Sequence, residues 1–334
     1  MVMQINPALA RIWLPGGTRQ YGYTNPTAIA HGSPDEHRAL DFLEQGISIA
    51  QTEQLTALAK VAETDIAKLL ERLSPVLKTS SKTLSSLMDA EVESHFAELA
   101  RIYLESNQDP ATLLSKRRQA RIFIEQLDRT GITITRALSA SFVGTFLSMD
   151  TQVVAEADTL ELGHRKELIG TNRVRSADLS IPASKVELHS RLSGAMERVD
   201  LAVLIATDVT NPDSYQVWMT REIPHIAVVF DERGVNVSPV ILPGITPCLA
   251  CYEVTRIHQD PNWISIGPQL LALDRSLADS AMMLFASSQV TNHALNLIDH
   301  GANLERKEFS VLRRSGELGA ASLPAANCGC RIAQ

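Results

Sequence analysis

The sequence predicts an α/β protein in which a mostly parallel sheet follows a small α+β domain. From Arg118 onward, short apolar runs alternate with segments long enough for crossover helices, a pattern typical of a parallel sheet. Before residue 80, strand-like runs precede three short amphipathic segments, which is typical of a winged-helix-like unit. We therefore expect a winged-helix-like domain at residues 1–80, a helical linker at 81–117 and an α/β domain at 118–334.

Composition restricts the class of protein. The chain has 334 residues, of which 45% are hydrophobic and 21% charged, as in ordinary globular proteins. Its formal net charge of −7 disfavours general binding to nucleic acid or a membrane surface. No apolar run approaches the ~20 residues of a membrane-spanning helix, and the first residues lack the features of a signal peptide. With its few cysteines arranged as metal-type pairs, the chain fits a reducing cytoplasm.

The N-terminal part contains turn and capping signals. Ser33 to Glu36 reads as a capping box with proline at the first helical position, and Gly46 ends that helix. The third predicted helix mixes acidic and basic residues without a basic face, so we favour a peptide-binding or structural role over DNA binding. The predicted strands are 11–15, 20–24 and 27–30, and the predicted helices are 33–46, 52–61 and 65–77.

The rest of the chain is predicted from its periodicity. A linker helix is expected at 90–105, and a strand at 235–241 is expected to pair as a hairpin with the strand before it. The methionine-rich helix at 278–298 is interpreted as core or as a subunit interface. The other predicted strands are 121–124, 144–150, 185–188, 200–206, 225–230 and 308–312.

The four cysteines form two close pairs, Cys248 with Cys251 and Cys328 with Cys330. Two such pairs complete the tetrahedral four-thiolate shell that Zn²⁺ prefers in structural sites. Buried thiols or a long-range disulfide are the alternatives. We predict a structural zinc, because the count is four with none left over.

A strand–turn–helix at residues 121–131 is the candidate nucleotide loop. Only Gly131 remains of the three glycines expected there, and Gln126 and Asp128 occupy the other two places. Asp128 puts a negative charge where phosphate would lie, and Arg129 could partly offset it. Asp150 follows Gly131 by 19 positions, where a ribose-binding carboxylate is expected.

Three further polar residues are candidates because they lie near strand ends. Asp208 could hold Mg²⁺ on a triphosphate with Asn211 beside it, and Arg173 could stabilise charge on a phosphoryl group. The alternatives are that the Asp208 region is a helix cap and that Arg173 is a surface cation. The histidines share no spacing and are interpreted as core or surface residues.

These motifs resemble the ThiF/MoeB/ubiquitin-activating superfamily. The resemblance rests on the strand–loop–helix, on Asp150 and Asp208, and on a Pro-Cys-x-x-Cys pair completed near the C-terminus. With Arg256 and the Asp260-Pro261-x-Trp263 motif, the chain further resembles an actinobacterial ThiF-like subgroup related to cyclodehydratase partner proteins of thiazole/oxazole-modified peptide synthesis.

The resemblance implies ATP-dependent adenylation of the C-terminal carboxylate of a peptide or small protein. It implies that Gly131 admits the phosphates, Asp150 holds the ribose, Asp208 holds Mg²⁺ and Arg173 clamps the phosphate. It also implies a homodimer. No cysteine is left for thioester chemistry when all four bind zinc.

Two function hypotheses follow. The first is a degenerate ThiF-like protein that binds a peptide or small-protein substrate, such as a leader peptide, for a partner modifying enzyme. This hypothesis rests on the loss of two of the three glycines expected in the nucleotide loop. The second is an active ATP-dependent adenylyltransferase that relies on Asp150, Asp208 and Arg173. A DNA-binding regulator is a distant third.

Overall fold

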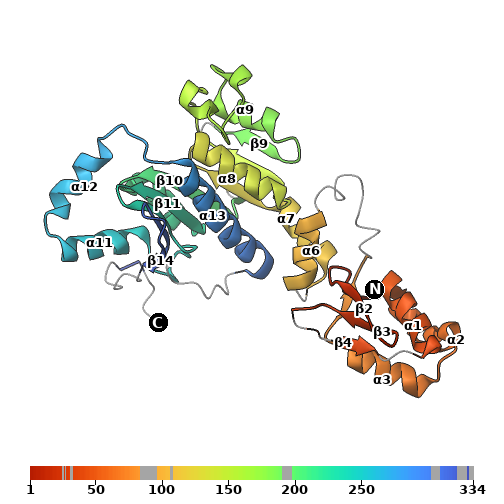
Figure 1. The fold of residues 1–334 in the computed structure, drawn as a ribbon. Coiled ribbons are helices and arrows are strands. Elements are labelled where there is room, and N and C mark those ends of the chain that lie inside the picture. Colours follow the sequence, from red (N-terminus) through yellow and green to blue (C-terminus); the bar gives the residue numbers. More distant parts are fainter. Residues whose placement is uncertain are drawn as a thin grey trace. The chain divides into compact units, whose positions relative to one another are not determined.

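The computed structural model describes residues 1–24, 26, 28–30, 33–82, 96–105, 108–189, 198–301, 309–321, 329 and 330 (Figure 1). The chain divides into two compact units, Met1–Ser115 and Lys116–Gln334. Each unit is described separately below. The domain limits at 80 and 117 and the winged-helix-like character of the first domain stay predictions. Among the described residues, no helix is both long and apolar enough to cross a membrane.

The first unit contains two three-stranded antiparallel sheets. One has the order β5 (Ile47–Ser48), β1 (Val2–Ile5), β6 (Leu77–Ser80), and the other the order β2 (Arg11–Leu14), β3 (Thr18–Tyr21), β4 (Ala28–Ala30). The sequence reading missed β1, β5 and β6. These strands are short, and Val2 pairs with Ser80, which is 78 positions away, so no local pattern identifies them.

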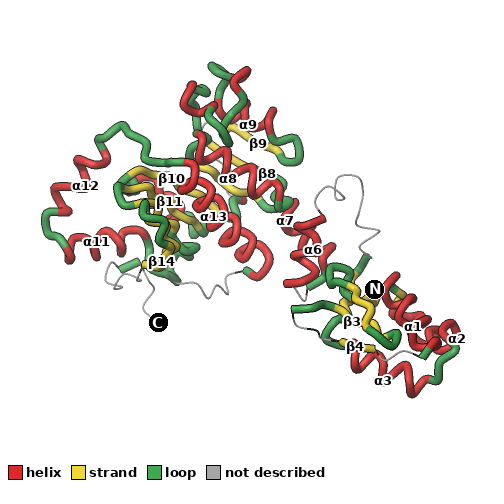
Figure 2. Tube along the Cα trace, viewed as in Figure 1, coloured by secondary structure: helices red, strands yellow, loops and turns green. Residues whose placement is uncertain are grey.

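Helices cover these sheets (Figure 2). Ser33 caps α1 through the amide of Glu36, as the capping signal predicts, and Gly46 ends the helix with φ of 89°. The prediction that the third helix reaches residue 77 is wrong, because α3 ends at Leu73 and a turn leads into β6. The linker helix is described from Phe96, and residues 83–95 lie outside the described part. The bounds are α1 Pro34–Gln45, a 3₁₀ turn Ile49–Gln51, α2 Thr52–Ala59, α3 Glu63–Leu73, α6 Phe96–Glu105 and α7 Pro110–Gln119, which crosses into the second unit.

The second unit is built on one eight-stranded sheet of order β14-β13-β12-β11-β10-β7-β8-β9. The five strands from β11 to β9 are parallel, and β12, β13 and β14 continue the sheet antiparallel. The predicted parallel α/β sheet and the predicted hairpin between β11 and β12 are confirmed. The strands are β7 Arg121–Ile124, β8 Thr145–Ser148, β9 Lys185–Leu188, β10 Leu201–Thr207, β11 His225–Asp231, β12 Gly234–Val237, β13 Phe309–Arg313 and β14 Leu318–Ala321.

Each face of this sheet carries its own helices, because successive strand residues point to opposite faces. Ile122 and Ile124 pack toward α8, α9 and α13, whereas Phe123 packs with Trp218 of α10 on the face that also carries α11. Helices α8 and α13 lie side by side (Figure 1). The helices are α8 Arg129–Ala140, 3₁₀ turns Glu156–Thr159 and Lys166–Leu168, α9 Arg173–Ser180, α10 Pro212–Thr220, α11 Leu249–Gln259, α12 Trp263–Leu271 and α13 Ser280–His300.

The strand order reverses between β7 and β10. From β7 the chain runs outward through β8 and β9, then returns to β10 on the other side of β7. In open α/β sheets, ligands bind at the carboxyl ends of the strands where the order reverses. The residues that follow β7 and β10 therefore form the candidate site.

Candidate functional site

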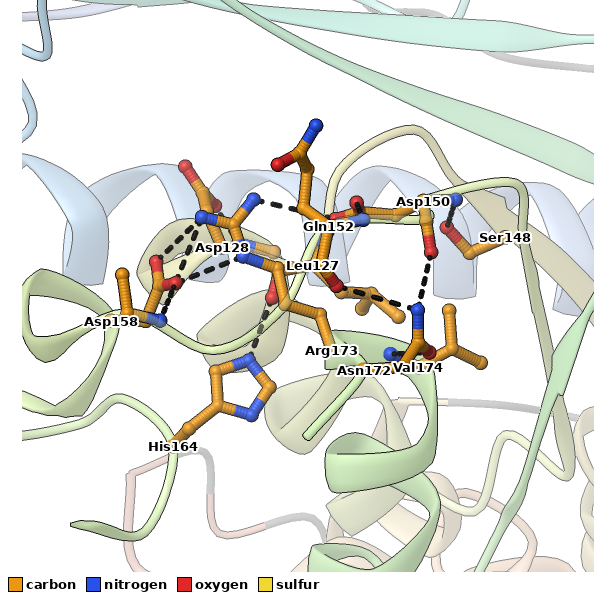
Figure 3. A network of polar contacts seen from close by, with 12 residues as sticks. Leu127, Asp128, Ser148, Asp150, Gln152, Asp158, His164, Asn172, Arg173 and Val174 are labelled. Carbon is orange, nitrogen blue, oxygen red and sulfur yellow. Dashed lines mark hydrogen bonds and ion pairs between the residues drawn. The ribbon is translucent and has the colours of Figure 1, made fainter. Parts of the chain in front are cut away.

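The loop after β7 is fixed by two neighbouring elements. The Leu127 amide donates to Oδ2 of Asp150 at 2.8 Å, and its carbonyl lies 2.7 Å from Nε2 of His164 (Figure 3). Because a carbonyl only accepts, Nε2 carries the proton, and Nδ1 accepts from the hydroxyl of Ser176 at 2.7 Å. Burial lowers the pKa of His164, which favours this neutral form. The loop is thus held from both sides before any ligand is bound.

Asp128 caps helix α8. Its Oδ1 accepts from the Gly131 amide at 2.9 Å, so the chain's own carboxylate occupies the helix N-terminus. Burial raises the pKa of Asp128, and the Gly131 amide and Arg173 oppose that shift. In a phosphate-binding loop, this helix end is left for the ligand.

Gly131 is required by packing. A Cβ atom at this position would lie 1.8 Å from the carbonyl oxygen of Gln126 and 3.4 Å from Cγ2 of Ile124. Only glycine lets α8 approach the preceding loop this closely, the role of the third glycine in a nucleotide loop. Its predicted contact with phosphate stays a prediction.

Asp150 and Arg173 belong to one ionic network. Arg173 donates from Nε and Nη2 to the two carboxylate oxygens of Asp158 at 2.9 and 3.0 Å, and its Nη1 lies 3.5 Å from Asp150 (Figure 3). Asp150 also accepts from the Gln152 amide at 2.9 Å. The carboxylates of Asp150 and Asp158 are almost fully buried. The sequence-predicted ribose and phosphate residues therefore meet, and they contact each other.

Glu125 spans the point where the strand order reverses. It follows the last residue of β7, and its Oε2 accepts from the Ile205 amide of β10 at 2.9 Å. Burial raises the pKa of Glu125, and hydrogen bonds from Ser214 and Ile205 oppose the shift. Its side chain thus continues the hydrogen bonding between β7 and β10 across the crevice.

Asp208 is paired with Arg275. The arginine Nε and Nη2 lie 2.9 and 2.8 Å from the two carboxylate oxygens, and only 5% of the Asp208 side chain is exposed. Asp208 has φ of 65°, which aspartate tolerates better than most residues. Arg275 lies in the segment between α12 and α13, 67 positions further along the chain. A guanidinium therefore contacts both oxygens that a metal ion would use.

The other two predicted residues have local partners. Asn211 accepts from the Asp213 amide at 3.0 Å and caps α10, so this residue and not Asp208 is the helix cap. Arg129 donates to the Glu161 carbonyl at 3.1 Å and to the Ser280 hydroxyl at 2.7 Å. Their predicted contacts with a nucleotide stay predictions.

Cys248, Cys251 and Cys330 form a candidate metal centre. Their Sγ atoms all lie within 4.8 Å of one another, with 4.0 Å between the first two and 3.4 Å between Cys251 and Cys330. Four sulfurs bound tetrahedrally at ~2.3 Å from zinc lie about 3.8 Å apart, so the spacing fits. Cys328 lies outside the described residues. These three thiols could hold a metal ion, and zinc as that metal stays a prediction.

The sequence identified the candidate site residues but not most of the residues that contact them. Glu125 had a signal, a carboxylate at the end of an apolar run, whereas Asp158, His164 and Arg275 had none. Their partners are 15, 37 and 67 positions away, and no motif spans those distances.

The chain resembles several solved structures. Escherichia coli MccB with AMPCPP and MccA matches with a TM-score of 0.70 and 11% identity over 99% of this chain and 100% of that one. E. coli MccB with ATP has a TM-score of 0.66, 11% identity and the same coverage. PaaA has a TM-score of 0.62 and 17% identity over 83% and 97% of the two chains.

No protein-family model and no curated protein sequence matches this chain. The likeness to MccB and PaaA nevertheless confirms the predicted ThiF-like fold. The narrower resemblance to an actinobacterial subgroup stays a prediction.

Proposed function

We propose that this protein binds a peptide or small-protein substrate, such as a leader peptide, for a partner modifying enzyme and that it does not use ATP. One observation carries the proposal. In the crevice of the ThiF-like fold, the chain's own side chains contact the groups that would hold a nucleotide and its metal ion.

Phosphate binding is opposed at the loop. Asp128 takes the helix-terminal amide of Gly131 and adds a negative charge beside it. Two like charges 4 Å apart at an effective dielectric constant of 20 repel by about 4 kcal/mol. The guanidinium of Arg129 directs donors to the Glu161 carbonyl and the Ser280 hydroxyl of the chain itself.

Ribose and metal binding are opposed in a similar way. A ribose must compete with the Leu127 amide and Arg173 for Asp150, and Mg²⁺ must displace Arg275 from Asp208. Both displaced arginines would then face a divalent cation or lose a buried partner. Without nucleotide, Asp150 and Asp208 each already have an arginine partner.

Peptide binding is supported by the full-length likeness to MccB, which was solved with MccA and, in another structure, with N-formylated MccA. The first unit also offers a site for an extended segment. Strands β2 and β4 are the outer strands of their sheet, and a peptide can add to an outer strand. Trp13 on β2 is 63% exposed beside Arg19, whose guanidinium lies 4.5 Å from its ring centre.

Two measurements on the full-length protein test the proposal. Calorimetry with Mg-ATP should show no binding, and labelled synthetic peptides encoded by reading frames next to the gene should bind in fluorescence anisotropy. Pyrophosphate exchange into ATP with any of these peptides would contradict the proposal, as would a failure of every such peptide to bind.

An ATP-dependent adenylyltransferase is the second candidate. The full-length likeness to MccB solved with ATP favours it. It requires Arg275 to leave Asp208, and it predicts ATP binding that weakens in Asp208→Ala. The matched control is Asp213→Ala in the first turn of α10, which should bind ATP as the wild type does.

A further inference from the structure

Helix α12 turns apolar side chains toward solvent. Of its nine residues, Trp263–Leu271, Gly267 is the one that is buried. Ile264 is 64% exposed and Leu271 is 45% exposed, and Pro268 between them is exposed as well. In a surface helix, the apolar residues normally face the core and the polar residues face solvent. We call the exposed row of Ile264, Pro268 and Leu271 the α12 stripe.

The helix is held in place on both sides of the stripe. Before it, Trp263 donates from Nε1 to Oε2 of Glu253 at 2.6 Å, and the guanidinium carbon of Arg256 lies 4.8 Å from the ring centre of Trp263. After it, Arg275 makes its bidentate contact with Asp208. Figure 1 shows α12 apart from the sheet, with a connecting segment at each end. The stripe is therefore presented on an ordered helix, which lowers the entropy lost when a partner binds.

The spacing of the stripe is that of a helix that binds in a groove. Ile264, Pro268 and Leu271 stand at positions i, i+4 and i+7, the spacing of the apolar anchors in helix-in-groove recognition. Leu273, just after the helix, is 52% exposed and extends the apolar surface. Pro268 has no amide, so the Ile264 carbonyl lacks its usual helical donor and is a further acceptor for a partner.

The charges around the stripe have one sign. Exposed carboxylates stand at both ends, Asp260 before the helix and Asp274 after it. No lysine, arginine or histidine occurs from Gln259 to Leu273. A complementary surface is an apolar groove with basic residues at its two ends, because interface charges are arranged so that opposite signs meet.

The same charges disfavour two other occupants. In a two-fold pair of α12 helices, parallel or antiparallel, the carboxylates of Asp260 and Asp274 would meet carboxylates of the second copy, and like charges repel. Helices that lie on membranes carry lysine and arginine on their polar face, whereas the polar residues of α12 are Ser265 and Gln269. The stripe therefore fits a different protein better than a second copy or a membrane.

We propose that the partner modifying enzyme docks on the α12 stripe and receives it in an apolar groove with basic ends. The inference rests on the proposed function and adds the surface through which the two proteins meet. This surface lies on the second unit, so docking there leaves β2 and β4 of the first unit accessible to a peptide.

Biolayer interferometry with full-length protein tests the apolar contact. The probes are the purified products of the enzyme-coding reading frames next to the gene. One of them should bind the wild type, and Ile264→Ser and Leu271→Ser should each weaken its binding at least tenfold. Leu58→Ser is the matched control, because Leu58 is also helical and is 51% exposed on α2 of the first unit, and it should bind as the wild type does. All three variants should keep the wild-type Tm, because the replaced side chains are exposed.

Charge reversal tests the basic ends of the groove. Asp274→Lys should weaken binding of the same enzyme, and wild-type binding should weaken as the salt concentration rises. Glu105→Lys changes the net charge equally at an exposed carboxylate of the first unit and should bind as the wild type does. Equal weakening by Asp274→Lys and Glu105→Lys would overturn the predicted contact between Asp274 and a basic end.

Three other outcomes would overturn the inference. The first is that none of the enzyme products binds the wild type, and the second is that the two stripe variants bind as tightly as the wild type. The third is that the stripe variants lose self-association in sedimentation velocity, or binding to vesicles of phosphatidylcholine and phosphatidylglycerol, which would assign the stripe to a second copy or to a membrane.

Peptide binding separates this inference from the proposed function. The labelled gene-neighbourhood peptides should bind Ile264→Ser as tightly as the wild type. If these peptides bind and no enzyme docks on the stripe, the peptide-binding function stands and the docking surface is wrong. If an enzyme docks on the stripe and no peptide binds, the docking surface stands and the proposed peptide binding is wrong.

Discussion

Gly131→Ala tests whether this glycine serves packing rather than phosphate binding. The added Cβ would lie 1.8 Å from the Gln126 carbonyl oxygen and 2.9 Å from its carbon. Ordinary nonbonded contacts are about 3.5 Å, so the loop or α8 must move by more than 1 Å. The helix-propensity gain of ~1 kcal/mol from replacing glycine is too small to compensate.

We expect Gly131→Ala to lower the free energy of unfolding by about 3 kcal/mol, at the upper end of overpacking costs. For a unit of this size, that corresponds to a fall in Tm of about 6–12 °C. Gly267→Ala is the matched control, because Gly267 is also helical and its added Cβ meets only Trp263 Nε1 at 3.8 Å. The free energy of unfolding of this control variant should rise by up to ~1 kcal/mol, because alanine has a higher helix propensity than glycine.

Calorimetry or circular dichroism on the full-length variants without any nucleotide measures both changes. If the two variants have the same Tm, or if Gly131→Ala melts with the wild type, the close approach of α8 to the loop is not what fixes this glycine.

Three further predictions concern stability. Metal analysis should return about one zinc per chain, and Cys251→Ser should release it and lower Tm, because structural zinc contributes folding energy; retention of metal by this variant would exclude the site. Asp299→Asn should lower the free energy of unfolding by about 3–5 kcal/mol, because Asp299 and Arg117 form a buried bidentate pair at 2.5 and 3.1 Å. Replacing both residues by leucine should lower it far less. Equal decreases in the two variants would argue against a stabilising role of the pair. Burial lowers the pKa of His225 to about 4 from 6.5, so between these pH values the unfolded chain binds a proton that the folded protein does not. The free energy of unfolding is therefore unaffected by His225 above pH 6.5. From pH 6.5 toward pH 4 it falls by about 1.4 kcal/mol per pH unit. Denaturant unfolding should show a shallower acid slope in His225→Leu, and an unchanged slope would show that His225 does not titrate this way.

The sequence alone determined the α/β architecture. Alternating apolar runs and crossover-length segments are local patterns, and they predict β7 to β11 as strands of a parallel sheet. Cys248 and Cys251 are also local, since three residues on one turn bring two thiols together. Gly131 was identified by its place after a strand, although its reason is the Gln126 carbonyl that only the folded loop brings near.

Only the tertiary structure decided how the candidate residues are used. Asp208 and Asp150 have the same positions along the chain whether they hold a ligand or an arginine. The outcome depends on Arg275 and Arg173, which lie 67 and 23 positions away and meet them only through the packing of the second unit. A buried carboxylate is stable only when a partner compensates its charge, and the identity of that partner is a property of the fold rather than of any local motif.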